Sequence, residues 1–144
     1  MSDRQRLYLA AFVRAFATGL IGVLLGVYQF NVKRRDPITQ DGMPLTPVGA
    51  MGVAIAINFQ PSGGGKAAIT GDFVLVAREV NPVIRVLRGN GIAVTALHSH
   101  MLDEQPRLFF MHFWANDDAM KLARGLRSAL DRMTTKTART TAGT

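Results

Sequence analysis

The sequence predicts an α+β domain in which an antiparallel sheet of about four strands carries two helices on one face. Two observations predict this architecture. Four stretches alternate apolar and polar residues with the period of a strand, and two stretches repeat apolar residues with the period of a helix. Their order is strand, strand, helix, and then the same again, which places both helices on one side of a single sheet. A chain of 144 residues that is 48% hydrophobic is long enough to bury a core.

The first 28 residues form an apolar block, which we expect to be a helix that precedes the domain. Between Leu7 and Tyr28 the only charged residue is Arg14, and the uninterrupted part is shorter than the ~20 residues of a bilayer span. A membrane anchor over residues 7–28, a signal sequence and a buried helix are all open interpretations. The stretch RLYLAAFVRAFATGLIGVLLG also resembles the first transmembrane helix of major-facilitator transporters, so a fusion remnant is a fourth. A membrane-anchored or exported protein is favoured, and a cytoplasmic one if the block is a remnant.

The next stretch, residues 29–50, is predicted to be a linker or loop, because it contains three prolines and two glycines. The α+β domain is expected over residues 51–133. In MGVAIAINFQP every second residue is a branched or aromatic apolar residue, which predicts a strand. The glycines of PSGGGK then turn the chain into a second strand, AAITGDFVLV.

The first helix is predicted over roughly residues 78–88. Val80, Val83 and Leu87 lie on one face of it, and a Gly-Asn-Gly sequence ends it. Because proline is disfavoured inside a helix, Pro82 suggests that the regular part begins only at Asn81, which would cap it.

The second half repeats the pattern. Strands are predicted over residues 92–102 and 107–114, joined by DEQP, and a final helix over residues 117–133 with Asn116 as its cap. The tail, residues 134–144, has no apolar pattern and is predicted to be disordered.

The sheet face away from the helices is expected to be apolar. It would carry Phe109, Met111 and Phe113, or else Phe110 and Trp114, depending on the register of the strand. That is more apolar surface than a solvent-facing strand normally shows. We therefore expect the N-terminal helix, a second copy of the domain or self-association to cover it.

Composition excludes several classes of function. The chain has no cysteine, so disulfides, thiolate metal sites, cysteine nucleophiles and lipid-modified cysteines are absent. Its formal net charge of +7 comes from dispersed residues, of which the run Lys33-Arg34-Arg35 is the densest. Because aromatic residues are not interleaved with these charges, solvated surfaces are the better interpretation, and no nucleic-acid partner is expected.

All three histidines of the chain fall in one predicted hairpin, TALHSHMLDEQPRLFFMHFW. His98 and His100 are two residues apart on a strand, so they share a face and lie roughly 6.5–7 Å apart. A register that pairs His112 with either of them brings all three together. Three imidazoles in this arrangement would hold a divalent metal such as Zn²⁺ at ~2.0–2.1 Å and leave a position open for water.

The sequence leaves three functions open. The leading hypothesis is a domain that binds a metal ion or small ligand through the three histidines, with Asp103 or Glu104 as a fourth ligand. The second is a metal-dependent hydrolase in which Glu104 is the base to a metal-bound water. The third is a structural module that dimerises through its open sheet face. A register shift of one residue would favour it over a histidine site, because the shift sends His112 to the other face. Asp72 either serves the same site or lies on a solvated edge.

Three phrases carry a resemblance to a known family: AINFQPSGGGKAAITGDFVL, EVNPVIRVLRGNGIAVTALHSHML and PRLFFMHFWANDDAMKLARGLRSAL. Over about residues 27–133 the chain resembles the LppY/LpqO lipoprotein family, a bacterial domain family without an established function. The resemblance implies an N-terminal export signal and often two copies of the unit. This chain departs from both, with one copy and no cysteine for lipid modification. The family name implies no mechanism, so the chemistry rests on the residues.

Overall fold

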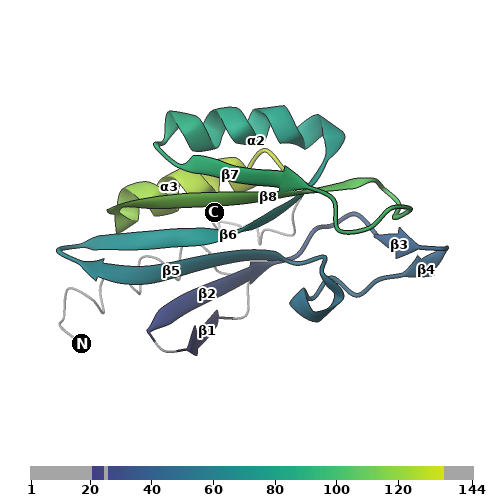
Figure 1. The fold of residues 1–144 in the computed structure, drawn as a ribbon, viewed down its shortest axis with the longest axis horizontal. Coiled ribbons are helices and arrows are strands. Elements are labelled where there is room, and N and C mark those ends of the chain that lie inside the picture. Colours follow the sequence, from purple (N-terminus) through teal and green to yellow (C-terminus); the bar gives the residue numbers. More distant parts are fainter. Residues whose placement is uncertain (1–20, 25, 135–144) are drawn as a thin grey trace, which may run out of the picture.

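In the computed structural model, which describes residues 21–24 and 26–134, six strands form one antiparallel sheet with both helices on the same face (Figure 1). Across the sheet the strands are β1 (Ile21–Leu24), β2 (Val27–Val32), β5 (Ile55–Gly63), β6 (Lys66–Val76), β8 (Leu108–Asp118) and β7 (Ala93–His98). The helices are α2 (Ala77–Gly89) and α3 (Ala119–Leu130). The predicted α+β class and the repeated strand-strand-helix order are confirmed, as β5-β6-α2 and β7-β8-α3.

The core lies between the sheet and the helices. Every second residue of β6 from Ala67 to Leu75 is buried, and these residues pair with Phe113 and Met111 of β8 on the same face. The helices add the apolar residues Val83, Leu87, Leu122, Leu126 and Leu130. The register of β8 therefore turns Met111 and Phe113 towards the helices, and it turns Phe110 and Trp114 towards the open face.

The end of the N-terminal block is a hairpin, so the prediction of a helix over residues 21–28 is wrong. β1 pairs with β2, and β2 pairs with β5. Gly26 takes φ +82°, which a tight turn between strands requires. Phe30 and Val32 are buried in the core, which explains why this apolar sequence joins the sheet. The predicted helix before residue 21 lies outside the described residues, and in the described part no helix is long and apolar enough to cross a membrane.

A layer of loops lies at one end of the sheet (Figure 1). It contains β3 (Thr39–Gln40), β4 (Met43–Pro44) and the 3₁₀ turn η1 (Gly49–Met51), within the stretch predicted as a loop. The backbone of Thr39 exchanges two hydrogen bonds of 2.8 Å with Gln105 in the loop between β7 and β8. The buried side chains of Ile38 and Val53 anchor the layer.

Two element boundaries differ from prediction for identifiable reasons. Helix α2 begins at Ala77, so Pro82 lies within it and Asn81 is not its cap. Its first turn is stabilised by Glu79, whose carboxylate accepts a 3.0 Å hydrogen bond from the Val76 N–H. At the other end of the chain β8 runs on to Asp118, whose side chain accepts a 2.7 Å hydrogen bond from the Lys121 N–H and caps α3.

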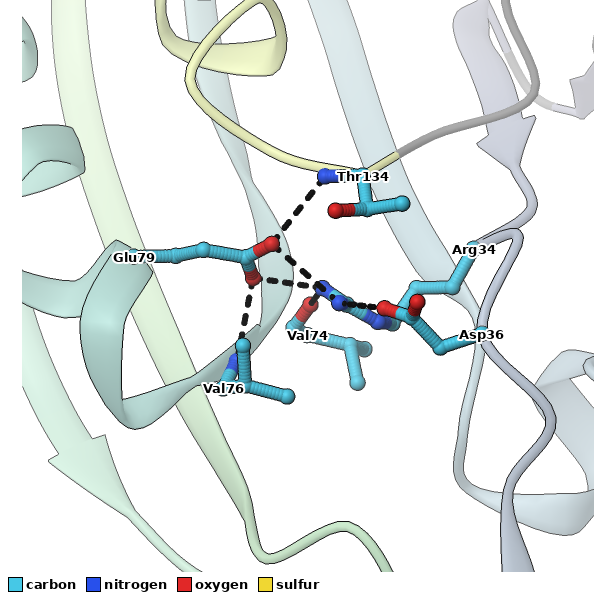
Figure 2. A network of polar contacts seen from close by, with 6 residues as sticks. All are labelled: Arg34, Asp36, Val74, Val76, Glu79 and Thr134. Carbon is cyan, nitrogen blue, oxygen red and sulfur yellow. Dashed lines mark hydrogen bonds and ion pairs between the residues drawn. The ribbon is translucent and has the colours of Figure 1, made fainter.

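A buried ion network joins distant parts of the chain (Figure 2). Arg34 follows β2, and its side chain is fully buried, although the sequence suggests a surface charge. Its Nη1 donates to Glu79 Oε2 at 2.7 Å and to the Val74 carbonyl at 2.8 Å, while Nη2 donates to Asp36. Glu79 also accepts a 3.0 Å hydrogen bond from the Thr134 N–H, just beyond α3. The network thus ties β2, α2 and the end of α3 together.

Each of the two central charges is stabilised by the other. Burial raises the pKa of the Glu79 carboxyl, but the hydrogen bond from Arg34 and those from two backbone N–H groups outweigh burial and hold this pKa below its usual value. Burial likewise lowers the pKa of the Arg34 guanidinium, and its hydrogen bonds to Glu79 and Asp36 outweigh that effect and raise it. The pair is therefore ionised inside the protein.

Candidate metal centre

Two of the three histidines meet on the open face of the sheet. His98 lies opposite Phe110, and His112 lies opposite Ala96. The sequence predicted that residue 98 or 100 would lie opposite His112. The observed partner, Ala96, is two or four residues away from those positions, and an even displacement keeps His98 and His112 on the same face. The Nε2 atoms of His98 and His112 are 2.7 Å apart, and their rings stack with centroids 4.8 Å apart.

His100 reaches the cluster from a loop. β7 ends at His98, so the prediction of a strand through residue 102 is wrong. The chain turns back over the sheet, and the His100 ring stacks on Phe110 with centroids 3.5 Å apart and 5.0 Å from the His98 ring. One ring nitrogen from each of the three histidines lies within 4.8 Å of the others.

Asp72 supports the cluster from the neighbouring strand. It lies directly opposite His112 in the pairing of β6 with β8, and its Oδ1 is 2.6 Å from His112 Nδ1. This oxygen is buried and accepts no well-aligned hydrogen bond, so the approach is close but off the N–H direction. Of the two interpretations of Asp72 that the sequence left open, the structure favours a place in the site.

His100 has a comparable partner, which the sequence did not suggest. Its Nδ1 lies 3.1 Å from the carbonyl oxygen of Gly52, the residue that ends η1. Gly52 is 48 residues away along the chain, and no local pattern marks it. An acceptor at Nδ1 favours the tautomer that is protonated there, which leaves the Nε2 lone pair available. At His112 the negative charge of Asp72, 2.6 Å from Nδ1, favours the same tautomer.

The three nitrogens are close enough to share one ion. Three points no more than 4.8 Å apart lie within about 2.8 Å of a common point, compared with the ~2.0–2.1 Å of a zinc–imidazole bond. In a tetrahedral zinc site the ligand atoms are about 3.3 Å apart. The Nε2 atoms of His98 and His112, which are 2.7 Å apart, must therefore separate, and the most distant pair of ring nitrogens must approach, by shifts on the order of 1 Å. His98 and His100 are exposed, which leaves room for such shifts.

The acidic residues of the predicted hairpin lie elsewhere. Glu104 is fully buried, and its carboxylate accepts hydrogen bonds from the Leu108 N–H at 2.9 Å and from Arg107 at 3.3 Å. It therefore holds the loop that carries His100. Asp103 is exposed. Among the described residues neither carboxylate belongs to the group of potential ligands, which contains the three histidines alone.

Fold and cluster together define a two-layer α+β domain with a candidate three-histidine metal centre on its open sheet face. The chain belongs to the family described as Domain of Unknown Function (DUF1259), whose family model matches residues 18–132. Neither the curated proteins nor the solved structures gave a match. The match supports the expectation of an uncharacterised domain family, while LppY/LpqO stays a resemblance that it does not confirm.

Proposed function

We propose that this LppY/LpqO-like domain binds one divalent metal ion, such as Zn²⁺, through His98, His100 and His112. The observation that carries the proposal is the pair of acceptors behind the rings. Histidines that bind metal almost always donate their other N–H to a carboxylate or a backbone carbonyl, which fixes the tautomer and the ring orientation. The Gly52 carbonyl lies in that position for His100, and the Asp72 carboxylate approaches His112 Nδ1 to 2.6 Å, although off the N–H direction.

A purely structural explanation accounts for less. Buried polar side chains must find partners within the protein, but His98 and His100 are exposed and have water available. The 2.7 Å hydrogen bond between His98 and His112 does not account for the approach of His100 to both rings. Their convergence costs side-chain freedom, and a shared ion supplies the compensating free energy.

The two alternative functions have weaker support. Hydrolysis needs a base beside the metal-bound water, but Glu104 is engaged by Leu108 and Arg107, and Asp72 faces His112. Self-association was expected because of an uncovered apolar face. Phe110 is only 1% exposed on that face, beneath the His100 ring, so the chain itself supplies part of the cover. Self-association through the remaining surface stays a prediction.

The proposal is tested by titrating the metal-free full chain with Zn²⁺ in a calorimeter and measuring bound zinc by elemental analysis. We expect one equivalent to bind, and His112→Ala to abolish saturable binding. Because the chain has three histidines and no cysteine, its carboxylates are the other side chains that can bind zinc, and loss of binding in this variant separates the two sources. Wild-type protein that takes up no zinc, or a variant that binds it unchanged, would refute the proposal.

A matched pair of variants tests the role of the carboxylate behind His112. Asp72→Asn should weaken zinc binding by about 10- to 100-fold, because the group that orients a ligand is lost. Asp117→Asn removes a carboxylate from the same sheet, where it pairs with Lys121, and should leave zinc affinity unchanged. Equal losses in both variants would indicate a general effect of charge and not a contact at the site.

A further inference from the structure

The sheet next to the histidines presents an exposed tryptophan in a polar row. Trp114 lies two residues beyond His112 on β8 and is 50% exposed, and strand geometry puts the two about 6.5–7 Å apart. Among the described large apolar residues with high exposure it is the one on this face, since Leu97 pairs with Met111 and Met43, Met51 and Leu102 lie outside the six-stranded sheet. A single exposed apolar residue is normal on a protein surface, so it is the position of this indole beside the candidate site that makes it a candidate ligand contact.

The strand register sets out the neighbours of Trp114. Thr70 lies directly opposite it on β6, Asn58 is next on β5, and Gln29 follows on β2. Two interstrand steps place Asn58 about 10 Å from Trp114. The parallel row that contains His112 has small residues, Ala96 and Ala56, on either side of the His112–Asp72 pair. The side chains of the row that contains Trp114 therefore project further from the sheet than the alanine side chains of the row that contains His112.

Two polar side chains of this surface are not used by the fold. Within the described structure the side chains of Asn58 and Thr70 make no hydrogen bond to protein. Asn116, on the far side of Trp114, has its Oδ1 bound by the Ser62 hydroxyl at 2.7 Å. That contact turns the amide so that its NH₂ group, a double donor, stays available.

We infer that this face, defined by Trp114, Thr70, Asn58 and Asn116, binds the flat face of a β-linked sugar chain beside the histidine cluster. A pyranose with equatorial hydroxyl groups has an apolar C–H face, which stacks on an indole, and a rim of hydroxyls, which both donate and accept hydrogen bonds. Amide and hydroxyl side chains match that rim. The platform does not require a metal, so this inference goes beyond the proposed function.

The charge of the surface argues against other ligands. The rows that contain Trp114 and His112 hold no lysine or arginine, and their ionisable groups are Asp72 and His112. Phosphorylated ligands and nucleic acids need cationic contacts that are missing there. The core of a protein interface gathers several aromatic residues, Met and Arg, but the neighbours of this single indole are polar or small. A neutral ligand with one apolar face is complementary both to the absence of cationic side chains in these rows and to the single exposed indole.

The test uses the full chain and its own reporter, because Trp114 is the single tryptophan. Cellohexaose and chitohexaose are titrated while the Trp114 emission is followed, once with zinc and once with a chelator. We expect a saturable change with a dissociation constant in the millimolar range or below. No saturation with either oligosaccharide, on protein shown to be folded by circular dichroism, would overturn the inference. Saturation in chelator supports it even if the zinc titration fails, so the two proposals fail separately.

Variants locate the binding surface by calorimetry. Trp114→Ala should weaken oligosaccharide binding by roughly tenfold or more, since an exposed aromatic anchor is lost. Asn58→Ala should weaken it by less. Leu102→Ala is the matched control, because Leu102 is 83% exposed in the loop between β7 and β8, outside the rows that contain Trp114 and His112. Unchanged binding by Trp114→Ala would place the sugar elsewhere and refute the assignment.

Discussion

The carbonyl of Gly52 decides which nitrogen His100 presents to the cluster. Gly52 has φ +67° and ψ +16°, the left-handed conformation in which a side chain is strained. A Cβ at this position would meet His100 Nδ1 at 3.7 Å, an ordinary contact. Backbone strain, and not a steric clash, is therefore what makes glycine the suitable residue here.

Gly52→Ala should lower the free energy of unfolding by about 1 kcal/mol, because alanine is disfavoured in the left-handed region. It should also weaken zinc binding, since relief of the strain rotates the carbonyl away from His100. Urea unfolding and zinc titration measure the two effects. Gly49→Ala is the control, because Gly49 has no positive φ and open space around it. Equal stability of Gly52→Ala and wild type would contradict this account of Gly52.

At the level of single residues, the sequence revealed the histidines but not their supports. His98, His100 and His112 stand out because the chain has no others. Asp72 could be suspected from its position in a predicted strand, and pairing it with His112 required the register of β6 against β8. The Gly52 contact could not be predicted, because nothing in a loop sequence indicates which carbonyl will face a ring.

At the level of elements, the Arg34–Glu79 pair fastens helix α2 to the β2 side of the sheet. Both side chains are almost fully buried, at 0% and 4% exposed. A pattern in the sequence does point to it, since Glu79 lies in register with Val83 and Leu87 on the buried stripe of α2. A charge on an apolar stripe requires a partner, but which of the dispersed arginines supplies it depends on the tertiary fold.

Glu79→Gln should lower the free energy of unfolding at pH 7 by about 3–5 kcal/mol, because it leaves the Arg34 charge buried without its partner. The pKa of Glu79 is lowered by folding, so its ionisation stabilises the fold above the unfolded value of about 4.3. That contribution is lost as the pH falls through the lower folded pKa. The difference between wild type and variant should therefore shrink below about pH 4.

Denaturant unfolding at a series of pH values measures this difference directly. Asp117→Asn is the matched control, since the pair of Asp117 with Lys121 is exposed and its loss should cause no comparable destabilisation. Combining Glu79→Gln with Arg34→Met should restore part of the stability, because no unpaired charge is then buried. A constant difference down to acidic pH would contradict the assigned role of the carboxylate.

Element types were predictable, and their ends were not. Alternation identified β5, β6 and β8, and helical periodicity identified α2 and α3. The end of the N-terminal block was misassigned, because an apolar run suits a helix and a buried strand equally well. Strand β8 extends through the predicted cap Asn116, because pairing with β6 continues as far as Asp118. Long-range pairing of this kind overrides local capping signals.

On the scale of the whole molecule, the candidate centre lies where β6, β8, the loop after β7 and the η1 turn meet. Antiparallel pairing puts Asp72 beside His112, and the loop layer at that end of the sheet brings Gly52 to His100 (Figure 1). The face was expected to be apolar, but only part of it is. Phe110 is covered by histidine rings, and the rest carries polar side chains around Trp114.

The most direct test of the metal centre is a nitrogen-15 NMR spectrum of the histidine side chains before and after one equivalent of Zn²⁺. With three histidines, single variants assign every signal. We predict that His100 and His112 are protonated at Nδ1 in the metal-free chain, and that zinc shifts the Nε2 resonances of all three rings together. Rings that keep their metal-free shifts, or that shift at Nδ1 for His100 and His112, would contradict the centre described above.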